Sequence, residues 1–196
     1  MLRNSIYDMK RIILLALALM VLVPWQAQAQ NFGAPEEMKG KFIVGGDADL
    51  GFAGNCFYVG VSPQAGYRLT RNFEIGTRLG YNMEYYWSQF YGNSFYHYFT
   101  GAVYANYEVF SGIFLHVEDE ELCTLVSVVD GGATSVQWYN SVFVGVGYRQ
   151  YFNDTWFSYY SALYNLSWSN GFLGGDSPYA SPYVIRVGIC KVLKGK

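Results

Sequence analysis

The chain has 196 residues with a formal net charge of −2, and 19% of them are aromatic while 14% are charged. An ordinary soluble domain has about 25% charged residues, so the composition favours a membrane β-protein, and the lack of a basic excess excludes a nucleic-acid-binding surface. Two stretches, 85–107 and 155–175, have no charged residue, yet Ser, Asn, Gly and Tyr interrupt them too often for a transmembrane helix. These stretches therefore predict transmembrane strands.

The start of the chain has the pattern of an export signal. Lys10 and Arg11 precede an apolar core over 12–24, and Ala27-Gln28-Ala29 forms a small-x-small cleavage motif. The alternative is an uncleaved membrane anchor, which the short core and the cleavage motif disfavour. The expected organisation is a signal peptide over 1–29, a polar lead-in over 30–39, a strand domain over 40–193 and a basic tail over 194–196.

The strongest strand pattern covers residues 56–86. On one parity, from Phe57 to Tyr85, the side chains are apolar nearly throughout, and on the other they are small, polar or charged. This alternation predicts two strands of about 14 residues joined by a turn at Thr70-Arg71-Asn72. Strands of soluble sheets average about five or six residues, whereas a tilted strand needs about 9 to 11 to cross a bilayer. We therefore expect this hairpin to cross a membrane with its apolar face towards lipid.

The same alternation predicts six more strands along the chain. They cover 40–52, 95–110, 113–125, 138–151, 155–168 and 180–193. The connections after the third, fifth and seventh strands are the long ones, at 87–94, 126–137 and 169–179, as in outer-membrane barrels with short periplasmic turns. Only a closed sheet satisfies the backbone of such strands in lipid. The expected fold is an all-β, eight-stranded antiparallel up-and-down transmembrane β-barrel.

Charged residues on the inward parity are expected to fill the barrel. Symmetric pairing around the turn places Arg68 opposite Glu74 and Gln64 opposite Arg78, and an analogous register brings Asp47 near Arg186. The expected lumen network is Asp47, Gln64, Arg68, Glu74, Arg78, Glu108, His116, Glu118, Arg149 and Arg186, with Glu84 and Glu120 on the same parity. An eight-stranded barrel is only wide enough to be filled by side chains, so a salt-bridged plug is favoured over a conducting pore.

Aromatic residues are expected at both edges of the barrel. Trp156 and Trp168 share a parity on the predicted seventh strand, and a separation of roughly 30 Å along the axis matches an apolar band with a girdle at each edge. The candidates for contact through the loops are Trp87, Phe90, Tyr91, Trp138 and Phe172. Exposed aromatics of this kind suit contact with protein, glycan or lipopolysaccharide, with girdle anchoring as the alternative.

No group of residues predicts catalysis. The two histidines, His97 and His116, are not combined in the sequence with a nucleophile and an orienting acid, so barrel-lining or rim histidines are favoured.

The charge run 118–121 and the cysteines leave alternatives open. Alternation sends Glu118 and Glu120 inward and Asp119 and Glu121 outward, where a solvated strand end is favoured over a site for divalent cations, so no metal site is assigned. The odd number of cysteines leaves at least one thiol free; a bridge between Cys56 and Cys123 stays open, with isolated thiols favoured.

Three motifs carry a resemblance to a known family. They are Val59-Gly60-Val61-Ser62-Pro63-Gln64-Ala65-Gly66-Tyr67, Asn72-Phe73-Glu74-Ile75-Gly76 and Gly147-Tyr148-Arg149. With them the whole chain after the signal resembles the small outer-membrane β-barrel proteins of the porin-like, outer-membrane-protein-A-like superfamily. The chain departs from that pattern at its end, 190–196, which lacks the usual final aromatic.

The resemblance implies export to the cell outer membrane, insertion by the outer-membrane assembly machinery, and contact with outer-membrane lipid and lipopolysaccharide. The family contains anchors, adhesins and narrow channels, and no cofactor is indicated. The expected function is a non-enzymatic barrel that anchors the membrane or contacts a surface ligand through its loops. A narrow channel for ions or small solutes is the alternative, and a lipid-A-modifying enzyme the third.

Overall fold

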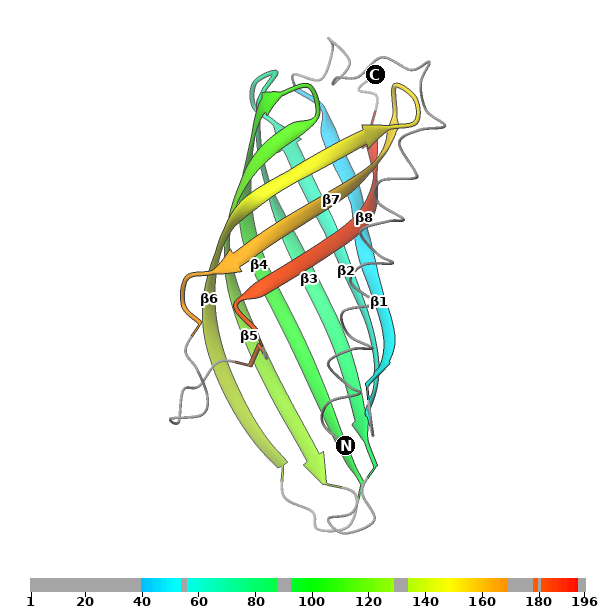
Figure 1. The fold of residues 1–196 in the computed structure, drawn as a ribbon, viewed down its shortest axis with the longest axis vertical. Coiled ribbons are helices and arrows are strands. Elements are labelled where there is room, and N and C mark those ends of the chain that lie inside the picture. Colours follow the sequence, from blue (N-terminus) through cyan, green and yellow to red (C-terminus); the bar gives the residue numbers. More distant parts are fainter. Residues whose placement is uncertain are drawn as a thin grey trace, which may run out of the picture. The chain divides into compact units, whose positions relative to one another are not determined.

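The computed structural model describes residues 40–53, 56–87, 93–128, 134–168, 178–179 and 181–193. In this part of the chain eight strands form one closed barrel, in which each strand pairs antiparallel with the next and β8 closes on β1 (Figure 1). The strands are β1 (Phe42–Ala53), β2 (Cys56–Arg68), β3 (Phe73–Tyr86), β4 (Ser94–Phe110), β5 (Ile113–Val128), β6 (Thr134–Tyr151), β7 (Trp156–Asn165) and β8 (Tyr183–Leu193). The predicted eight-stranded up-and-down barrel is confirmed. The predicted signal peptide (1–29), lead-in (30–39) and basic tail (194–196) lie outside the described residues.

No helix within the described ranges is long and apolar enough to span a membrane.

The strand register fixes the tilt of the strands. When the cross-strand partners are followed from Phe42 through β2 to β7, the last partner, on β8, is Tyr183. The direct β8 partner of Phe42 is Leu193, ten residues later, so the stagger around the barrel is ten residues. A stagger of this size in a barrel of eight strands corresponds to a tilt of roughly 40–45° and to an interior that side chains can fill.

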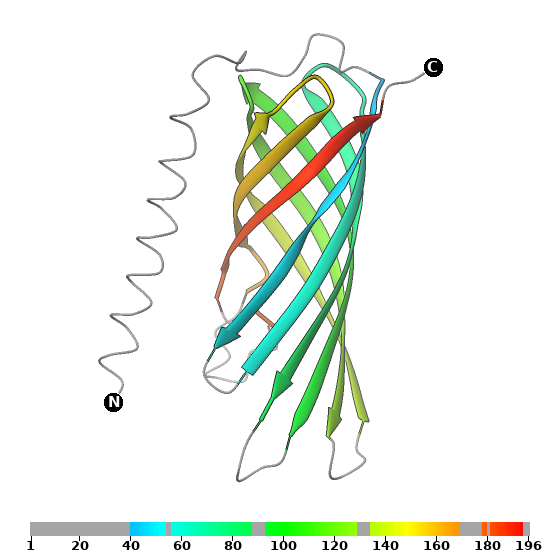
Figure 2. The same cartoon turned by 90° about the vertical axis from the view of Figure 1, so that its right-hand side faces the viewer.

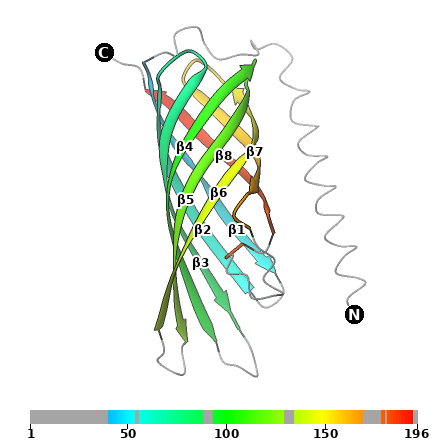
Figure 3. The ribbon, with the colours of Figure 1, turned by 90° about the vertical axis from the view of Figure 1, so that its left-hand side faces the viewer.

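The two ends of the barrel differ. At one end, which we call the turn end, the connections are the short segments 69–72, 111–112 and 152–155. At the opposite end, the loop end, β3 to β6 extend beyond the other strands, as Figures 2 and 3 show. β7 has only 10 residues and β6 has 18, so the pairing of β6 with β7 stops at Phe143 and Asn165 while β6 continues towards the loop end.

Four predicted strand boundaries at the loop end are wrong. The loop expected over 126–137 is mostly strand, because β5 and β6 stay paired as far as Ser127 and Thr134. β7 ends at Asn165 instead of Trp168, since the Asn165 side-chain oxygen accepts a hydrogen bond from the Ser167 backbone N–H at 2.9 Å and forms a local turn. β8 begins at Tyr183 instead of Ala180.

The two faces of the sheet differ in polarity in the direction that the alternation predicts. Outward-facing Leu79 and Ile185 are 65% and 67% exposed, whereas Arg68 and Glu120 on the inner face are 0% exposed. The inner face is not purely polar, because Ile43, Phe114 and Phe157 are also buried there. The outer face thus carries many large apolar side chains, and the inner face combines charged groups with apolar and aromatic side chains.

Glycines make room for a large ring in the interior. Gly66 and Gly76 are cross-strand partners, and Tyr104 lies next to them on β4. A Cβ added at Gly76 would lie 2.4 Å from Cζ of Tyr104 and 2.5 Å from the Ala65 carbonyl oxygen. Only glycine therefore allows the Tyr104 ring to lie flat on this part of the wall.

We predict that Gly76→Val destabilises the barrel by about 1–3 kcal/mol, because the new side chain overlaps a ring and a backbone oxygen that cannot both move away. Urea unfolding of the refolded chain, followed by tryptophan fluorescence, measures the change. Gly101→Ala is the control, since a Cβ there meets no atom within 4 Å. Equal stability of the two variants would contradict the packing argument.

Candidate functional site: the charged interior of the barrel

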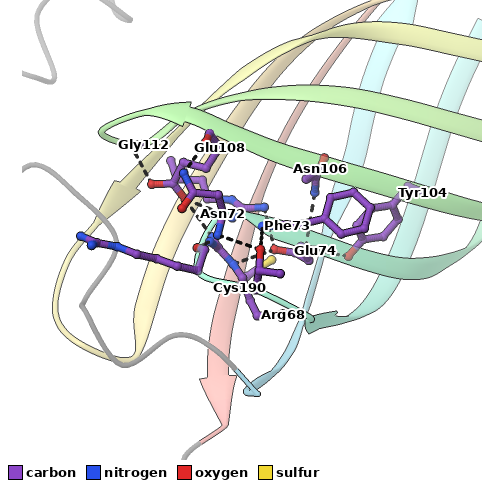
Figure 4. A network of polar contacts seen from close by, with 12 residues as sticks. Arg68, Asn72, Phe73, Glu74, Tyr104, Asn106, Glu108, Gly112 and Cys190 are labelled. Carbon is purple, nitrogen blue, oxygen red and sulfur yellow. Dashed lines mark hydrogen bonds and ion pairs between the residues drawn. The ribbon is translucent and has the colours of Figure 1, made fainter.

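A first group of buried charges lies near the turn end. It consists of Arg68, Glu74, Glu108 and Arg149, which we call the turn-end cluster. Figure 4 labels the first three of them. Arg68 contacts Glu74 at 3.3 Å and Glu108 at 3.0 Å. Arg149 contacts the same two carboxylates at 2.7 Å and 3.8 Å. Two guanidinium groups and two carboxylates form a closed, electrically neutral ring, as buried charges require.

Uncharged groups complete the turn-end cluster. The second Glu74 oxygen accepts from the Tyr104 hydroxyl at 3.2 Å and from the Asn106 amide at 3.4 Å. The second Glu108 oxygen accepts from the backbone N–H of Gly112 at 3.2 Å, so the β4–β5 turn is tied to the cluster. The Arg149 guanidinium also lies over the rings of Phe114 and Phe157, at 4.7 Å and 5.4 Å.

A second neutral group lies further into the barrel. It consists of Arg78, Glu118, Glu120 and Arg186, which we call the central cluster. Arg78 contacts Glu118 at 2.8 Å and Glu120 at 2.6 Å, and Arg186 contacts them at 2.7 Å and 3.7 Å. Arg186 also lies 5.1 Å from the centre of the Phe143 ring. All four side chains are less than 10% exposed, so this cluster closes the middle of the lumen.

His116 connects the two clusters. Its Nδ1 lies 2.7 Å from the Asn106 side-chain oxygen and its Nε2 lies 3.3 Å from a Glu118 oxygen. A cavity of about 30 Å³ lies between the clusters and is lined by side chains of both. This space holds one or two water molecules and is too small for a hydrated ion or an organic solute.

The structure places the residues of the predicted lumen network on the inward parity of their strands. Arg68 pairs with Glu74 and Gln64 with Arg78 in the β2–β3 register, as expected. For Asp47 and Arg186, the β1–β8 register places Asp47 opposite Gly188, two residues along β8 from Arg186, and these two described side chains form no ion pair. Asp47 accepts a hydrogen bond from the Tyr159 hydroxyl at 2.6 Å, and Arg186 reaches across the lumen to β5.

The sequence reasoning missed a residue that closes the central cluster from the loop end. This residue is Tyr179, which follows β7 and precedes β8 in the chain. Its hydroxyl donates a hydrogen bond to Glu120, and the centroid of its ring lies 5.3 Å from that of Phe143. Burial, reinforced by the neighbouring Glu120, raises the pKa of the Tyr179 phenol. Its carbonyl oxygen accepts from Trp168 Nε1 at 2.9 Å. The alternation of a strand gives no direction for the side chain of a loop residue such as Tyr179. Tyr104 and Asn106, in contrast, share the parity of Glu108 on β4, so their inward direction could have been predicted.

Two of the described aromatic candidates, Trp168 and Trp138, occupy different places from those expected. Trp168 is half-buried beyond the end of β7, so the spacing that paired it with Trp156 in two girdles does not apply. Trp156 faces outward at the turn end, with the Lys191 ammonium 5.2 Å from its ring. Trp87 is exposed just after β3, and Trp138 lies within β6 on the outward face, 69% exposed. Phe90, Tyr91 and Phe172 lie outside the described residues.

The charge run and the remaining polar candidates show no catalytic arrangement in the described part of the chain. Outward-facing Asp119 and Glu121 each accept a hydrogen bond from the Asn140 amide, at 2.9 Å and 3.0 Å, in mid-strand instead of at the expected strand end. No group of three or more His, Cys, Asp or Glu side chains in the described ranges is arranged to hold a metal ion. His97 contacts the Tyr81 hydroxyl at 3.0 Å.

The three cysteines are free, so the bridge left open between Cys56 and Cys123 is absent and isolated thiols are confirmed. Cys190 faces the lumen, where its sulfur accepts a hydrogen bond from Gln64 at 2.9 Å.

Comparison with known proteins gives similarities of structure only. No protein-family model and no curated protein matches the chain. Among solved structures, the N-terminal β-barrel domain of Pseudomonas aeruginosa OprF is similar with a TM-score of 0.47 and 13% identity, over 79% of this chain and 98% of that one. A structure from the de novo design of transmembrane β-barrels is similar with a TM-score of 0.36 and 15% identity, over 81% of this chain and 100% of that one. At such scores neither similarity carries an inference about what this chain does.

Proposed function

We propose that the chain is a non-enzymatic outer-membrane β-barrel that acts as a structural anchor and contacts its surroundings through the loop end. The observation that carries the proposal is the filling of the lumen by two neutral ion-pair clusters, the turn-end cluster and the central cluster. A barrel filled in this way has no space in which to pass or process a solute.

The outer wall supports insertion in a membrane. Strands of 10 to 18 residues are long enough to cross an apolar layer at a steep tilt. Many large apolar side chains are exposed on the wall, among them Leu79, Val103 and Ile185. Such a surface is costly in water and is satisfied by lipid.

The clusters support a closed interior. All four cluster glutamates are paired with arginine, so neither cluster needs a bound ion for charge balance. Tyr179 covers Glu120 from the loop end, and Arg68 donates to the carbonyl oxygen of Arg71 in the β2–β3 turn at 2.7 Å. Both ends of the plug are therefore tied to segments between strands.

The positions of the histidines support a role other than catalysis. His116 has both ring nitrogens engaged by Asn106 and Glu118, and the described residues place no serine or cysteine within hydrogen-bond reach of it. A nucleophile, a base and an orienting acid are thus not assembled around it.

A narrow channel is the second candidate, which the polar and charged side chains in the cavity lining, such as Glu74, Arg78 and His116, favour. Passage would require the central cluster to separate, because Arg78 and Arg186 bridge the same two carboxylates. Breaking these contacts leaves buried charges without partners of opposite sign, so the closed state is the stable one.

We predict that Arg78→Met destabilises the barrel by about 3–5 kcal/mol, because Glu118 and Glu120 then share one partner, Arg186, instead of two. Urea unfolding in lipid vesicles measures the loss. Arg71→Met, at an exposed turn position, is the control that removes a guanidinium without touching the clusters. A stability equal to that of the control would contradict the view that the clusters hold the interior together.

We predict that the unmodified chain shows no steady conductance in planar lipid bilayers, since the central cluster blocks the lumen. The measurement is single-channel recording after insertion of the refolded chain. Steady openings on the nanosiemens scale would overturn the closed interior and favour the channel.

We predict that replacing 88–92 with Gly and Ser, together with Trp87→Ser, weakens binding to immobilised lipopolysaccharide by about tenfold, because the exposed Trp87 and the aromatic residues Phe90 and Tyr91 of the sequence are removed. Surface plasmon resonance with the solubilised chain measures the change. Trp156→Ser removes a similarly exposed indole at the turn end and is expected to leave binding unchanged. Unaltered binding after the loop replacement would count against a contact role for this loop.

A further inference from the structure

The loop end of the lumen face carries a group of tyrosines around one carboxylate. On the same face of the sheet as Arg78, the ladder pairs Tyr58 of β2 with Glu84 of β3, and Glu84 with Tyr96 of β4. Tyr86 and Tyr98 are the next lumen-face residues on β3 and β4. We call these five residues, Tyr58, Glu84, Tyr86, Tyr96 and Tyr98, the tyrosine patch.

Contacts within the tyrosine patch are close. The Tyr98 hydroxyl donates a hydrogen bond to a Glu84 oxygen at 3.0 Å. The rings of Tyr86 and Tyr96 have centroids 5.4 Å apart and planes at 76°, so they form an edge-to-face contact. Cross-strand neighbours on one face lie within side-chain reach of each other, which makes the patch continuous across three strands.

The patch is open to solvent. Tyr58 and Tyr86 are 37% and 42% exposed, and the other three members are half-buried. The buried cluster residues deeper in the lumen are covered by one another, whereas ring surface and carboxylate here remain accessible. Accessible aromatic faces grouped around polar atoms are a common form of ligand site.

Glu84 differs from the cluster glutamates in its partner. Those four carboxylates each contact an arginine, while in the described residues Glu84 is bonded to a phenol and has no Lys or Arg partner. The sequence has no Lys or Arg in 79–148 or in 150–185, so the chain brings none to the loop end from these segments. A carboxylate among tyrosines, with no cation of its own, is complementary to a positive charge supplied from outside.

We propose that the tyrosine patch binds a small organic cation with an alkylated ammonium head group. The ring faces of Tyr86 and Tyr96 attract the diffuse positive charge through their quadrupoles, and Glu84 neutralises it. The central cluster, with Arg78 and Arg186, forms a floor that stops the cation from passing further. This site lies on the inner wall and is independent of loop contact, so it goes beyond the proposed function and is tested without it.

The test uses choline as the probe and its uncharged carbon analogue, 3,3-dimethylbutan-1-ol, as the matched ligand. The full chain is refolded in a nonionic maltoside detergent, because amine-oxide and phosphocholine detergents carry the same kind of head group. Isothermal titration measures both ligands. Choline is expected to bind at least about tenfold more tightly than the analogue, since only the charge differs. Equal affinity, absence of choline binding, or binding of maltotriose without binding of choline would overturn the proposal.

Variants locate the site. Glu84→Gln and Tyr96→Leu are each expected to weaken choline binding about tenfold, and Tyr96→Phe to retain it, because the ring and not the hydroxyl attracts the cation. Glu121→Gln is the control, since it removes an exposed carboxylate from the outward face of the same sheet. Circular dichroism and the unfolding midpoint verify that each variant is folded. A Glu84→Gln variant that binds choline as the unmodified chain does would overturn the assignment.

Discussion

Closure of eight strands with a stagger of ten residues is the constraint on which the rest of this structure depends. It leaves an interior about as wide as the side chains that point into it, so inward side chains such as Arg186 and Glu118 meet across the lumen. A charge in that space cannot reach bulk water and has to be neutralised by a neighbour. The two clusters satisfy this requirement with two arginines and two glutamates each, drawn from strands far apart in the sequence.

The same inward parity has different chemistry along the barrel axis. From the turn end to the middle it carries Arg–Glu pairs that fill the lumen, and at the loop end it carries tyrosines around Glu84. The change coincides with the place where β3 to β6 extend beyond their neighbours, shown in Figures 2 and 3. A closed ring of eight strands enforces charge neutrality, whereas the extended part leaves side chains partly exposed. Stability is thus concentrated in one half, and accessible polar and aromatic surface in the other.

The errors in the strand boundaries share one cause. Polar residues such as Ser127 and Thr134 suggest a loop when taken alone, yet they pair across strands because a long hairpin continues as far as its partner does. Conversely, the apolar alternation of 155–168 continues past Asn165, whose side chain bonds to the backbone of Ser167 and ends the strand. Cross-strand pairing and local side-chain hydrogen bonds determine where these strands end. The alternation of apolar and polar residues contains no information about either interaction.

The sequence by itself determined the barrel, its faces, the β2–β3 register and the composition of the lumen, because period-two alternation fixes the direction of every strand residue once pairing is antiparallel. Pairs joined by a short turn, such as Arg68 with Glu74, follow from symmetry around that turn. Contacts across the lumen do not, since they depend on shear and on closure between β8 and β1. For that reason only the tertiary structure decided that Arg186 meets Glu118 instead of Asp47, that Tyr179 covers Glu120, and that four tyrosines surround Glu84.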